Sequence, residues 1–265
     1  MMKKIEFYKY HGAGNDFVVI DNRLKNISLD ENSVKYLCDR HFGIGADGLM
    51  LIENIDNHDF KMRYFNSDGK EASMCGNGGR CIVAFAKSLG IIENSATFET
   101  FDGIHSAIIS EKNALPWVQL KMSDVDISGV LKGSNFANTG SPHHIEYISD
   151  LSNLDVNKAG AEIRYSDDYK AIGGTNVNFV KLISDSKIEI RTYERGVEFE
   201  TLACGTGSTA AAIISGIRAQ KNTASYQVQT LGEILEVSYK IDGNFAREVF
   251  LSGPAKEVFK GTINI

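Results

Sequence analysis

The chain carries one motif twice, and each copy ends in a cysteine. Residues 62–79 read MRYFNSDGKEASMCGNGG, and residues 190–208 read IRTYERGVEFETLACGTGS. Arg63 aligns with Arg191. After one extra residue in the second copy, Glu71 aligns with Glu200 and Cys75 aligns with Cys204. The copies lie close to half of the 265 residues apart, as expected for a duplicated half-molecule rather than a short solenoid repeat. The sequence therefore predicts two similar halves that present Cys75 and Cys204 to one substrate from opposite sides.

The composition limits the class of protein. A length of 265 residues is enough for two domains with their own cores, and 23% charged residues are typical of a soluble globular protein. The net charge of −6 and the absence of a Lys/Arg cluster argue against a nucleic-acid partner. Apolar runs such as 17–20 are too short to span a bilayer, and no apolar signal-peptide segment follows the first lysines. We expect a cytoplasmic protein with a small-molecule partner and no membrane partner; a homodimer is one option that the sequence leaves open.

The spacing of the thiols argues against metal and disulfide chemistry. There is no C-x-x-C pair, which is the usual signature of zinc sites and dithiol oxidoreductases. His143 and His144 are adjacent, so on regular structure they would point in different directions. We expect no metal site and no disulfide scaffold. The four cysteines are Cys38, Cys75, Cys81 and Cys204.

The patterns of apolar residues predict a mixed fold of the α/β (α+β) class. Alternation predicts strands, and helices are expected at 33–39, from Gly78 to the stop at Gly90, and at 209–217. The last of these is apolar on nearly every face, which is typical of a buried helix. We expect two pseudo-symmetric domains, each a mixed sheet wrapped around a buried central helix. The expected strands are 4–10, 17–21, 60–65, 96–101, 105–110, 117–122, 135–139, 144–148, 175–180, 187–193 and 257–263.

The domain boundaries follow from the position of the repeat. The N-terminal domain is expected at 1–117 and carries Cys75, and the C-terminal domain is expected at 118–255 and carries Cys204. The last strand, at 256–265, is expected to return to the first domain.

A Cys-Gly-x-Gly sequence at the start of a helix has a definite chemistry. The first helical turn has backbone N–H groups without partners and a favourable field for negative charge. It therefore lowers the pKa of a neighbouring thiol and offers donors to a carboxylate. An α-amino acid held there would present its Cα–H to a thiolate, and the same donors would stabilise the developing negative charge. With one thiol removing the proton and the other returning one to the opposite face, the centre inverts without a cofactor.

A structural interpretation of the cysteines competes with this one. A free cysteine usually behaves as a small buried hydrophobe. Cys38 and Cys81 fit that description, because each lies in a helix candidate among apolar neighbours. Cys75 and Cys204 fit it poorly, because each opens a glycine-rich helix start and has an equivalent in the other half.

Several segments together resemble the diaminopimelate epimerase family, in order and over nearly the whole chain. Taken as a set, these motifs are highly specific. They are His11-Gly12-x-Gly14-Asn15-Asp16-Phe17, Gly43-Ile44-Gly45-Ala46-Asp47-Gly48, Phe65-Asn66-Ser67-Asp68-Gly69-x-Glu71, Met74-Cys75-Gly76-Asn77-Gly78-x-Arg80-Cys81, Thr175-Asn176-Val177-x-Phe179-Val180, Tyr193-Glu194-Arg195-Gly196 and Ala203-Cys204-Gly205-Thr206-Gly207.

The resemblance implies interconversion of LL- and meso-2,6-diaminopimelate, for lysine and peptidoglycan precursors, without pyridoxal phosphate. It also implies an active site in the cleft between the two domains. Starting from the LL isomer, Cys204 would abstract the proton and Cys75 would supply one. His143 and Glu194 match the pair that tunes the thiols. The implied substrate-binding positions are Asn15, Gly48, Asn66, Gly76, Asn77, Ser141, Asn176, Glu194, Arg195, Gly205 and Thr206.

Three departures from the family pattern affect the expected site. Ser141 stands where many members have asparagine, and Gly48 stands where some have glutamine. The segment 196–201 makes the spacing between the Glu-Arg pair and the second cysteine one residue longer than usual. These differences concern recognition of the far end of the substrate rather than the two-thiol reaction.

Two alternatives remain open at this point. A two-thiol racemase of the same fold acting on proline or hydroxyproline would not need Glu194 and Arg195 to hold a second amino-acid end. A redox-sensing binding protein would use the two thiols to form a disulfide. Exchange of the α-proton in deuterated water separates these, because a sensor exchanges nothing and a proline racemase labels proline.

Overall fold

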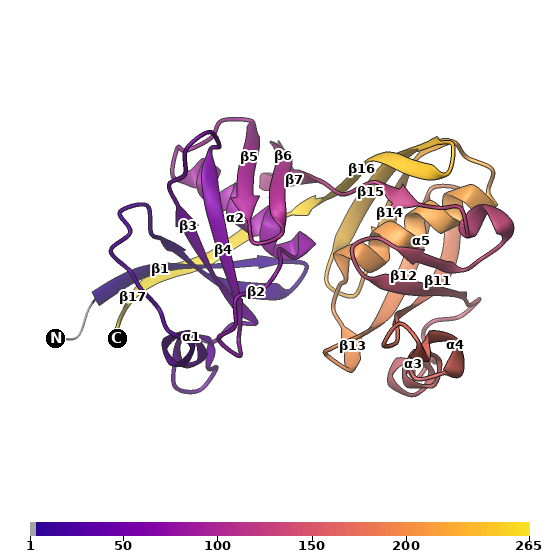
Figure 1. Cartoon of the computed structure of the whole chain (residues 1–265), viewed down its shortest axis with the longest axis horizontal. Helices are drawn as coiled ribbons and strands as arrows, with labels where there is room; N and C mark the ends of the chain where they lie inside the picture. Colours follow the sequence, from indigo (N-terminus) through magenta and orange to yellow (C-terminus); the bar gives the residue numbers. More distant parts are fainter. Residues whose placement is uncertain (1–3) are drawn as a thin grey trace. The chain divides into compact units, whose positions relative to one another are not determined.

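The computed structural model describes residues 4–265 and divides into two units (Figure 1). Unit 1 contains the described residues up to Leu120 together with Pro254–Ile265, and unit 2 contains Lys121–Gly253. Each unit combines many strands with few helices, so the mixed α/β class is confirmed.

Unit 1 is a mixed sheet with two helices. Its strands pair in the order β17, β1, β2, β3, β4, β5, β6 and β7, and all neighbours are antiparallel except the parallel pairs β2–β3 and β4–β5. The C-terminal strand β17 therefore joins the N-terminal strand β1. The elements are β1 (Lys4–Gly12), β2 (Asn15–Asp21), α1 (Glu31–Cys38), β3 (Gly48–Glu53), β4 (Phe60–Asn66), α2 (Gly76–Ser88), β5 (Ser95–Thr100), β6 (Gly103–Lys112), β7 (Leu115–Lys121) and β17 (Lys256–Asn264).

Local sequence explains the elements that position Cys75. The β1–β2 hairpin turns at Ala13 and Gly14, which both have positive φ, 56° and 84°. Helix α2 is buried from Gly76 to Ala86 and contacts β1, β2, β3 and β6. It ends before Gly90, which has a φ of 69° and cannot continue the helix. The helix predicted from Gly78 is therefore present, and it begins two residues earlier, directly after the cysteine.

Unit 2 is a second mixed sheet around a longer helix. Strands β9, β10, β11, β12, β14, β15, β16 and β8 pair in that order, β13 pairs with β12, and β10–β11 and β12–β14 are the parallel pairs. The elements are β8 (Val125–Asp126), η1 (Val130–Lys132), β9 (Phe136–Asn138), β10 (Pro142–Tyr147), α3 (Val156–Arg164), α4 (Asp167–Lys170), β11 (Asn176–Ser184), β12 (Lys187–Glu194), β13 (Phe199–Thr201), α5 (Gly205–Arg218), β14 (Thr223–Gln229), β15 (Ile234–Asp242) and β16 (Phe245–Pro254).

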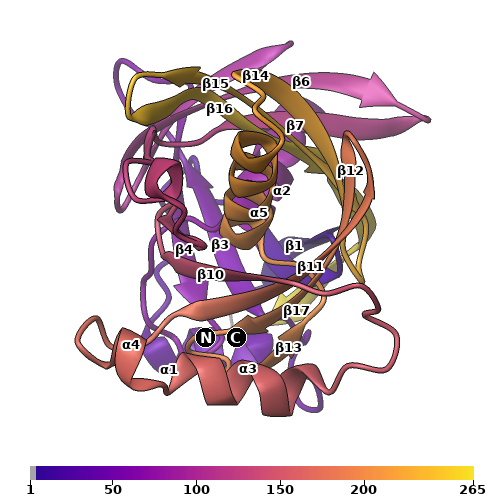
Figure 2. The ribbon, with the colours of Figure 1, turned by 90° about the vertical axis from the view of Figure 1, so that its right-hand side faces the viewer.

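Helix α5 is the centre of unit 2. Figure 2 shows it among the strands of its unit, and it contacts β9, β10, β11, β12, β14 and β15. Its residues are buried almost without interruption from Gly205 to Gly216, as the sequence predicts for a helix that is apolar on nearly every face. Gly216 allows Tyr239 of β15 to pack directly against α5, because a Cβ at Gly216 would lie 1.6 Å from Tyr239 Oη.

Several elements are absent from the sequence prediction. Strand β3 reads GLMLIE and is buried at almost every position, so it lacks the alternation that marks a half-exposed strand. Helix α3 is only nine residues long, and the Asp155 side chain caps it by accepting a hydrogen bond from Lys158 N. Strands β13 to β16 also lie outside the predicted set.

Within residues 4–265, the structure contains no helix of the length and apolar character needed to cross a membrane.

Replacing Gly160 in α3 by alanine should destabilise the protein, although alanine is the better helix former. An added Cβ would lie 2.4 Å from Tyr193 Cβ, and the base of that side chain cannot move away without its strand. Overpacking of this kind costs about 1–3 kcal/mol of the free energy of unfolding. Urea unfolding measures it, with Lys158→Ala on the exposed face of α3 as the matched control. A Gly160→Ala protein as stable as the control would contradict the close packing of α3 on β12.

Candidate active site

Cys75 caps helix α2 with its sulfur. Its backbone is extended, and its Sγ accepts a hydrogen bond from Gly78 N at 3.2 Å. The sulfur thus takes the place that a serine or aspartate oxygen usually has at an N-cap. A donor at the first turn of a helix favours negative charge on the atom that it faces. Cys75 is half-buried, so its sulfur combines a helix-end environment with access from outside.

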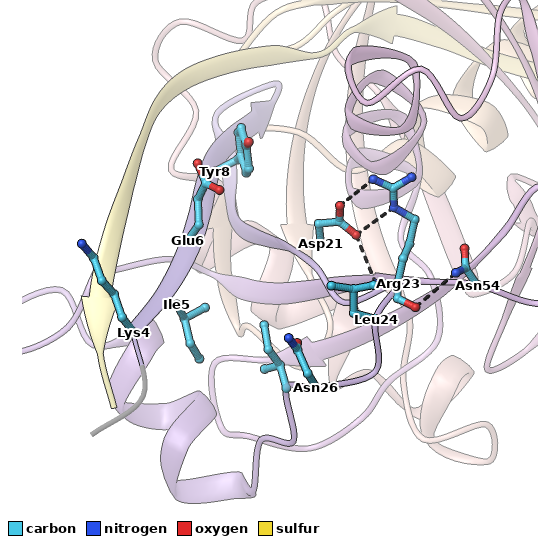
Figure 3. A pocket seen from close by; sticks show the side chains of 10 residues that line it. Lys4, Ile5, Glu6, Tyr8, Asp21, Arg23, Leu24, Asn26 and Asn54 are labelled. Atoms are coloured by element: carbon cyan, nitrogen blue, oxygen red, sulfur yellow. Dashed lines mark hydrogen bonds and ion pairs between the residues drawn. The ribbon is translucent and has the colours of Figure 1, made fainter. Parts of the chain in front are cut away.

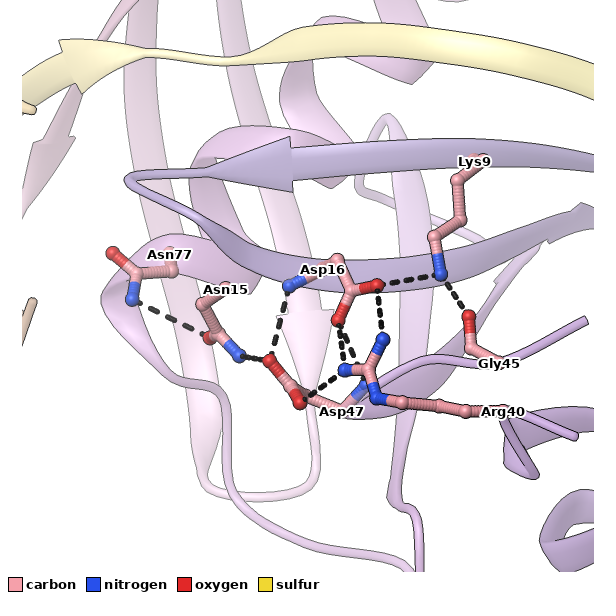
Figure 4. Close-up of polar contacts among 7 residues, drawn as sticks. All are labelled: Lys9, Asn15, Asp16, Arg40, Gly45, Asp47 and Asn77. Carbon is pink, nitrogen blue, oxygen red and sulfur yellow. Dashed lines mark hydrogen bonds and ion pairs between the residues drawn. The ribbon is translucent and has the colours of Figure 1, made fainter. Parts of the chain in front are cut away.

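The amide of Asn15 lies beside this sulfur in a fixed orientation. Its Nδ2 donates to Asp47 Oδ2 at 2.7 Å, so its Oδ1 faces the other way (Figure 4). That oxygen lies 3.9 Å from Cys75 Sγ and 3.4 Å from Asn77 Nδ2. The oxygen can accept a hydrogen from the thiol of Cys75, because a carbonyl oxygen is an acceptor only.

An ionic network holds Asp47 in place. Arg40 Nη2 lies 2.7 Å from both Asp47 Oδ1 and Asp16 Oδ1, and Lys9 Nζ lies 2.7 Å from Asp16 Oδ2 (Figure 4). Lys9 is buried and also donates to the carbonyl of Gly45. Burial alone would raise the pKa of Asp16, but hydrogen bonds from Arg40 and Lys9 outweigh it and hold that pKa well below the ordinary value. Asp16, which shares Arg40 with Asp47, is therefore kept charged.

Asn77 is oriented from the other side by a fully buried arginine. Arg80 Nη2 donates to Asn77 Oδ1 at 2.9 Å, and Arg80 Nη1 donates to the carbonyl of Gly76 at 3.2 Å. The side-chain NH₂ of Asn77 is thereby turned toward Asn15 Oδ1. Gly76 and Asn77 are the first two residues of α2, where the predicted carboxylate clamp requires them.

Gly48 and Asn66 lie opposite each other across strands β3 and β4. A Cβ on Gly48 would lie 2.6 Å from Tyr64 Cε2 and 2.7 Å from the Phe65 carbonyl oxygen. The glutamine that some family members carry there would therefore not fit without movement of the β4 backbone. Asn66 is exposed at the end of β4, and its role in binding stays a prediction.

Cys204 occupies the equivalent place before helix α5, but its polar neighbours differ. It is the N-cap residue, it is 8% exposed, and its Sγ lies 3.4 Å from Thr206 Oγ1. Thr206 follows Gly205 in the first turn, and its carbonyl accepts a hydrogen bond from Thr139 Oγ1 at 2.8 Å. The second thiol thus faces a hydroxyl, whereas the first faces an amide oxygen.

His143 and Ser141 complete this cluster from strand β10 and the residue before it. His143 Nε2 lies 2.9 Å from both Ser141 Oγ and Thr206 Oγ1, and the two hydroxyl oxygens are 3.3 Å apart. Burial and the positive charge of Arg195 lower the pKa of His143 to about 3. The imidazole is therefore neutral near neutral pH.

The residues expected to hold the far end of the substrate lie at the starts and ends of β11 and β12. Asn176 Nδ2 donates to the Pro142 carbonyl at 2.8 Å and to Ser141 Oγ at 3.3 Å, and Asn176 Oδ1 accepts from Arg195 N at 2.9 Å. The guanidinium of Arg195 makes a long contact, 3.4 Å from Nη1 to the Gly174 carbonyl. Asn176 thus fixes the backbone from which Arg195 projects.

Glu194 is oriented by a hydroxyl rather than by a thiol. Its Oε2 accepts from Thr201 Oγ1 at 2.9 Å. Burial raises the pKa of Glu194, and this hydrogen bond offsets part of the shift. The expected influence of Glu194 on a thiol stays a prediction. The extra residue of the second repeat lies in the loop after Arg195, where Glu198 accepts from Gly196 N and pairs with Arg164 at 3.0 Å.

Each unit therefore gathers one cysteine with its own polar neighbours. Unit 1 brings Asn15 and Asn77 to Cys75, and unit 2 brings Thr206 and His143 to Cys204. The other two cysteines, Cys38 and Cys81, are buried and 4% and 0% exposed. Burial raises the pKa of Cys38 to about 11, which makes it unreactive near neutral pH.

Sequence reasoning missed three residues of these clusters. Asp47 and Arg80 lie within the glycine-rich motifs that contain Ala46 and Cys75, and a charged residue directly before the apolar run of α2 is a usable signal for Arg80. Asn178 is two residues beyond Asn176, so both lie on one face of β11. Asparagine is uncommon inside strands, and this second buried asparagine was the signal that could have identified it.

Among the described residues, neither a metal-binding group nor the cavity of unit 1 described below coincides with these clusters. The described part of the chain has no group of three or more His, Cys, Asp or Glu side chains arranged to hold a metal ion. A cavity of about 580 Å³ lies elsewhere in unit 1, between the ends of β1 and β2 and the loop after β2 (Figure 3). It is lined by residues such as Lys4, Tyr8 and Arg23, and none of the predicted site residues borders it.

Known sequences match the chain over nearly its full length. The family described as diaminopimelate epimerase matches residues 7–127 and 135–258. A diaminopimelate epimerase of Flavobacterium psychrophilum is 49% identical over 260 residues, covering 98% of this chain and 100% of the relative. One from Aquifex aeolicus is 43% identical over 279 residues, covering 98% of both chains.

Solved structures with low sequence identity share the fold. A phenazine biosynthesis protein of the PhzF family from Bacillus anthracis superposes with a TM-score of 0.76 at 16% identity, over 100% of both chains. A hydroxyproline epimerase from Agrobacterium vitis gives a TM-score of 0.70 at 15% identity, over 99% of this chain and 92% of that one. At these identities the likeness concerns the fold alone.

The neutral state of His143 should be visible in the pH dependence of stability. The folded protein binds a proton at His143 only near pH 3, whereas the unfolded chain binds one below about pH 6.5. The contribution of the neutral imidazole to the free energy of unfolding is therefore present above about pH 6.5 and is lost as the pH falls. His143→Gln should therefore flatten the loss of unfolding free energy between about pH 6.5 and 4. The raised pKa of Glu194 changes the free energy of unfolding with pH in the opposite direction, but this effect is the same in wild type and in His143→Gln.

Urea unfolding at several pH values measures this difference. His41→Gln, at an exposed position, serves as the control and should keep the wild-type slope. Identical slopes for wild type and His143→Gln would contradict a neutral buried imidazole.

Proposed function

Because the chain belongs to the diaminopimelate epimerase family, we propose that it interconverts LL- and meso-2,6-diaminopimelate by proton transfer between two thiols. The observation that carries this proposal is the duplicated helix start, at which Cys75 and Cys204 are the N-cap residues of two buried helices. One such thiol is a common structural feature, whereas two equivalent ones suit a reaction that needs a group on each face of a carbon.

The reaction needs no group beyond the two sulfurs and the donors around them. A thiolate takes the Cα proton, the electron pair of that C–H bond spreads into the adjacent carboxylate, and the second thiol then protonates Cα from the opposite face. The first-turn N–H groups of α2 and α5 hold the carboxylate and stabilise its added negative charge. After turnover the first sulfur carries the proton taken from Cα and the second sulfur is a thiolate, so the reverse reaction uses the same groups in exchanged roles.

The polar neighbours support opposite roles for the two sulfurs when the LL isomer is the substrate. Asn15 Oδ1 can accept the hydrogen of a Cys75 thiol, and Thr206 Oγ1 can donate to a Cys204 thiolate. In this assignment Cys204 abstracts and Cys75 protonates. His143, as a neutral imidazole beside Thr206, acts on Cys204 through that hydroxyl.

The far end of the substrate carries a second carboxylate and a second ammonium group. We assign the carboxylate to Arg195, whose planar guanidinium can bind it with two hydrogen bonds, and the ammonium to Glu194. Asn66 and Asn176 supply uncharged donors and acceptors. Ser141 is shorter than the asparagine of many family members, so we assign it a water-mediated contact. Gly48 contributes no side chain.

We further propose that the protein works in the cytoplasm, where its substrate class is made and thiols stay reduced. A homodimer stays a prediction that light scattering of the purified protein would test.

Removing either proposed catalytic thiol should abolish epimerisation and leave the fold intact. Cys75→Ala and Cys204→Ala each delete the acid or base on one face, and Cys→Ser should retain weak activity at most, because an alcohol is a poorer acid and base near neutral pH. Incorporation of deuterium at Cα in deuterated water, with LL-diaminopimelate and separately with proline, measures the reaction and identifies the substrate. Cys81→Ala is the control, which should lose some packing and keep turnover. Near-normal epimerisation by Cys75→Ala or by Cys204→Ala would contradict the two-thiol mechanism.

Loss of Arg195 should impair turnover as well as apparent affinity. Leaving one partner of a buried charged pair without the other costs about 2–5 kcal/mol, or roughly 30- to several thousand-fold in kcat/KM. Because remote binding energy also positions the reacting carbon, kcat should fall too. Arg195→Lys should recover only part, since a point charge cannot replace a planar guanidinium.

Steady-state kinetics of Arg195→Ala and Arg195→Lys with LL-diaminopimelate provide the test. Arg247→Ala is the control, because Arg247 pairs with Asp124 on the surface. Wild type should act poorly on lysine, which lacks the far carboxylate. Racemisation of lysine at the rate seen with diaminopimelate would refute far-end recognition.

A further inference from the structure

The imidazole of His143 lies between an amide on one side and two hydroxyls on the other. It is fully buried, with Nδ1 3.1 Å from Asn178 Nδ2 and Nε2 2.9 Å from Ser141 Oγ and Thr206 Oγ1. A neutral imidazole has one ring N–H, so one of these two sides receives a hydrogen and the other must give one. The tautomer therefore decides in which direction the hydrogen bonds run.

Asn178 settles this choice, because its own orientation is fixed by the His144 carbonyl, which can only accept a hydrogen bond. Its Nδ2 donates to the His144 carbonyl at 3.0 Å, and its Oδ1 accepts from Thr192 Oγ1 at 3.0 Å. A rotated amide would place its oxygen against the His144 carbonyl, which can only accept. The nitrogen that faces His143 Nδ1 is thus a donor, and Nδ1 is an acceptor.

We propose that Asn178 is a positioning residue that fixes His143 as its Nε2–H tautomer, so that hydrogen bonds are donated from His143 through Thr206 toward the sulfur of Cys204. The assignment extends the proposed function, since it rests on that function for the role of the sulfur. The positions of the hydrogens follow from the described contacts alone.

The hydroxyls of Ser141 and Thr206 keep the hydrogen bonds running in one direction, from His143 toward Cys204. Ser141 Oγ already accepts from Asn176 Nδ2 at 3.3 Å, and Thr206 Oγ1 accepts from the imidazole. The hydrogen of Thr206 is then available for Cys204 Sγ, 3.4 Å away. A hydrogen bond donated to sulfur favours the thiolate. With the opposite tautomer, His143 Nε2 would accept the hydrogen of Thr206 and the sulfur would lose it.

Two further features keep this arrangement in one state. Burial keeps His143 neutral near neutral pH, and the nearby charge of Arg195 acts in the same direction, so only one ring hydrogen has to be placed. Gly207 in the first turn of α5 allows the close packing, because a Cβ there would lie 2.3 Å from Asn178 Oδ1 and 3.3 Å from His143 Cε1. The Cys-Gly-x-Gly sequence thus provides space for the asparagine and the histidine as well as for a ligand.

The tautomer can be observed directly in the protein without substrate. Nitrogen NMR of ¹⁵N-histidine-labelled protein distinguishes a protonated ring nitrogen from an unprotonated one, and the His143 signals are those missing from His143→Gln. We expect hydrogen on Nε2 and none on Nδ1 in wild type. Asn178→Asp, which replaces the donor by an acceptor, should place a hydrogen on Nδ1. Hydrogen on Nδ1 in wild type, or an unprotonated Nδ1 in Asn178→Asp, overturns the proposal.

Thr192→Val is the matched control for a purely structural effect. It removes a buried contact to the same amide and leaves the His144 carbonyl to orient it. This variant should lose stability but keep the wild-type tautomer. A changed tautomer in Thr192→Val would show that the His144 carbonyl does not fix the amide.

The link to sulfur has its own readout. The alkylation rate of Cys204 by iodoacetamide, followed by peptide mapping at one neutral pH, should fall about tenfold in Asn178→Asp, which corresponds to about one pKa unit of the thiol. It should stay at the wild-type rate in Thr192→Val. In epimerisation assays Asn178→Asp should lower kcat with little change in KM, because the effect is on the proton transfer. Equal alkylation rates in all three proteins overturn the link.

These readouts separate the two proposals. If the NMR and alkylation results are as expected but no α-proton exchange occurs with diaminopimelate, the proposed function fails alone. If exchange occurs but wild-type His143 carries its hydrogen on Nδ1, the role of Asn178 fails alone.

Discussion

Each half of the chain is organised around a helix that is buried along most of its length and begins directly after a cysteine. A buried helix cannot leave its first-turn N–H groups to bulk water, so those groups need partners supplied at the helix start. In unit 1 the sulfur of Cys75 is one such partner, accepting from Gly78 N. In the proposed reaction the first-turn N–H groups would also hold the substrate carboxylate, and the glycines leave room for it.

The arginine and glutamate of the repeat explain how the cysteine is placed at that helix end. Arg63 binds both oxygens of Glu71, at 3.0 and 3.2 Å, and Arg191 binds both oxygens of Glu200, at 2.6 and 2.7 Å. In each unit the pair joins the strand before the cysteine to the segment that leads into it. Two hydrogen bonds from one guanidinium fix the orientation of the carboxylate as well as its distance, which a lysine would not do. The repeat thus retains the residues that position the thiol as well as the thiol itself.

The sequence predicts those features that depend on local pattern, and it fails where distant segments decide. The alternation in β1 and the all-round apolar character of α5 predict both elements, and the duplicated motif locates both cysteines. Strand β3 is missed because a strand buried on both faces has no alternation. The contact between Asn178 and His143 is beyond local reasoning, because it depends on the parallel register of β10 and β11, which aligns His143 with Asn176.

The two halves keep the same thiol position but differ in what faces the sulfur. Next to Cys75 lies an amide oxygen, oriented by the hydrogen bond from Asn15 Nδ2 to Asp47. Next to Cys204 lies a hydroxyl that can receive its hydrogen bond from a neutral imidazole. Cys75 Sγ also accepts from Gly78 N, so the difference lies in the side-chain neighbours. An acceptor favours a thiol and a donor favours a thiolate, so these neighbours break the symmetry that duplication gives to the proposed two-face proton transfer. The proposed two-thiol mechanism requires both, because two thiols in equal states would leave the enzyme with two acids or two bases.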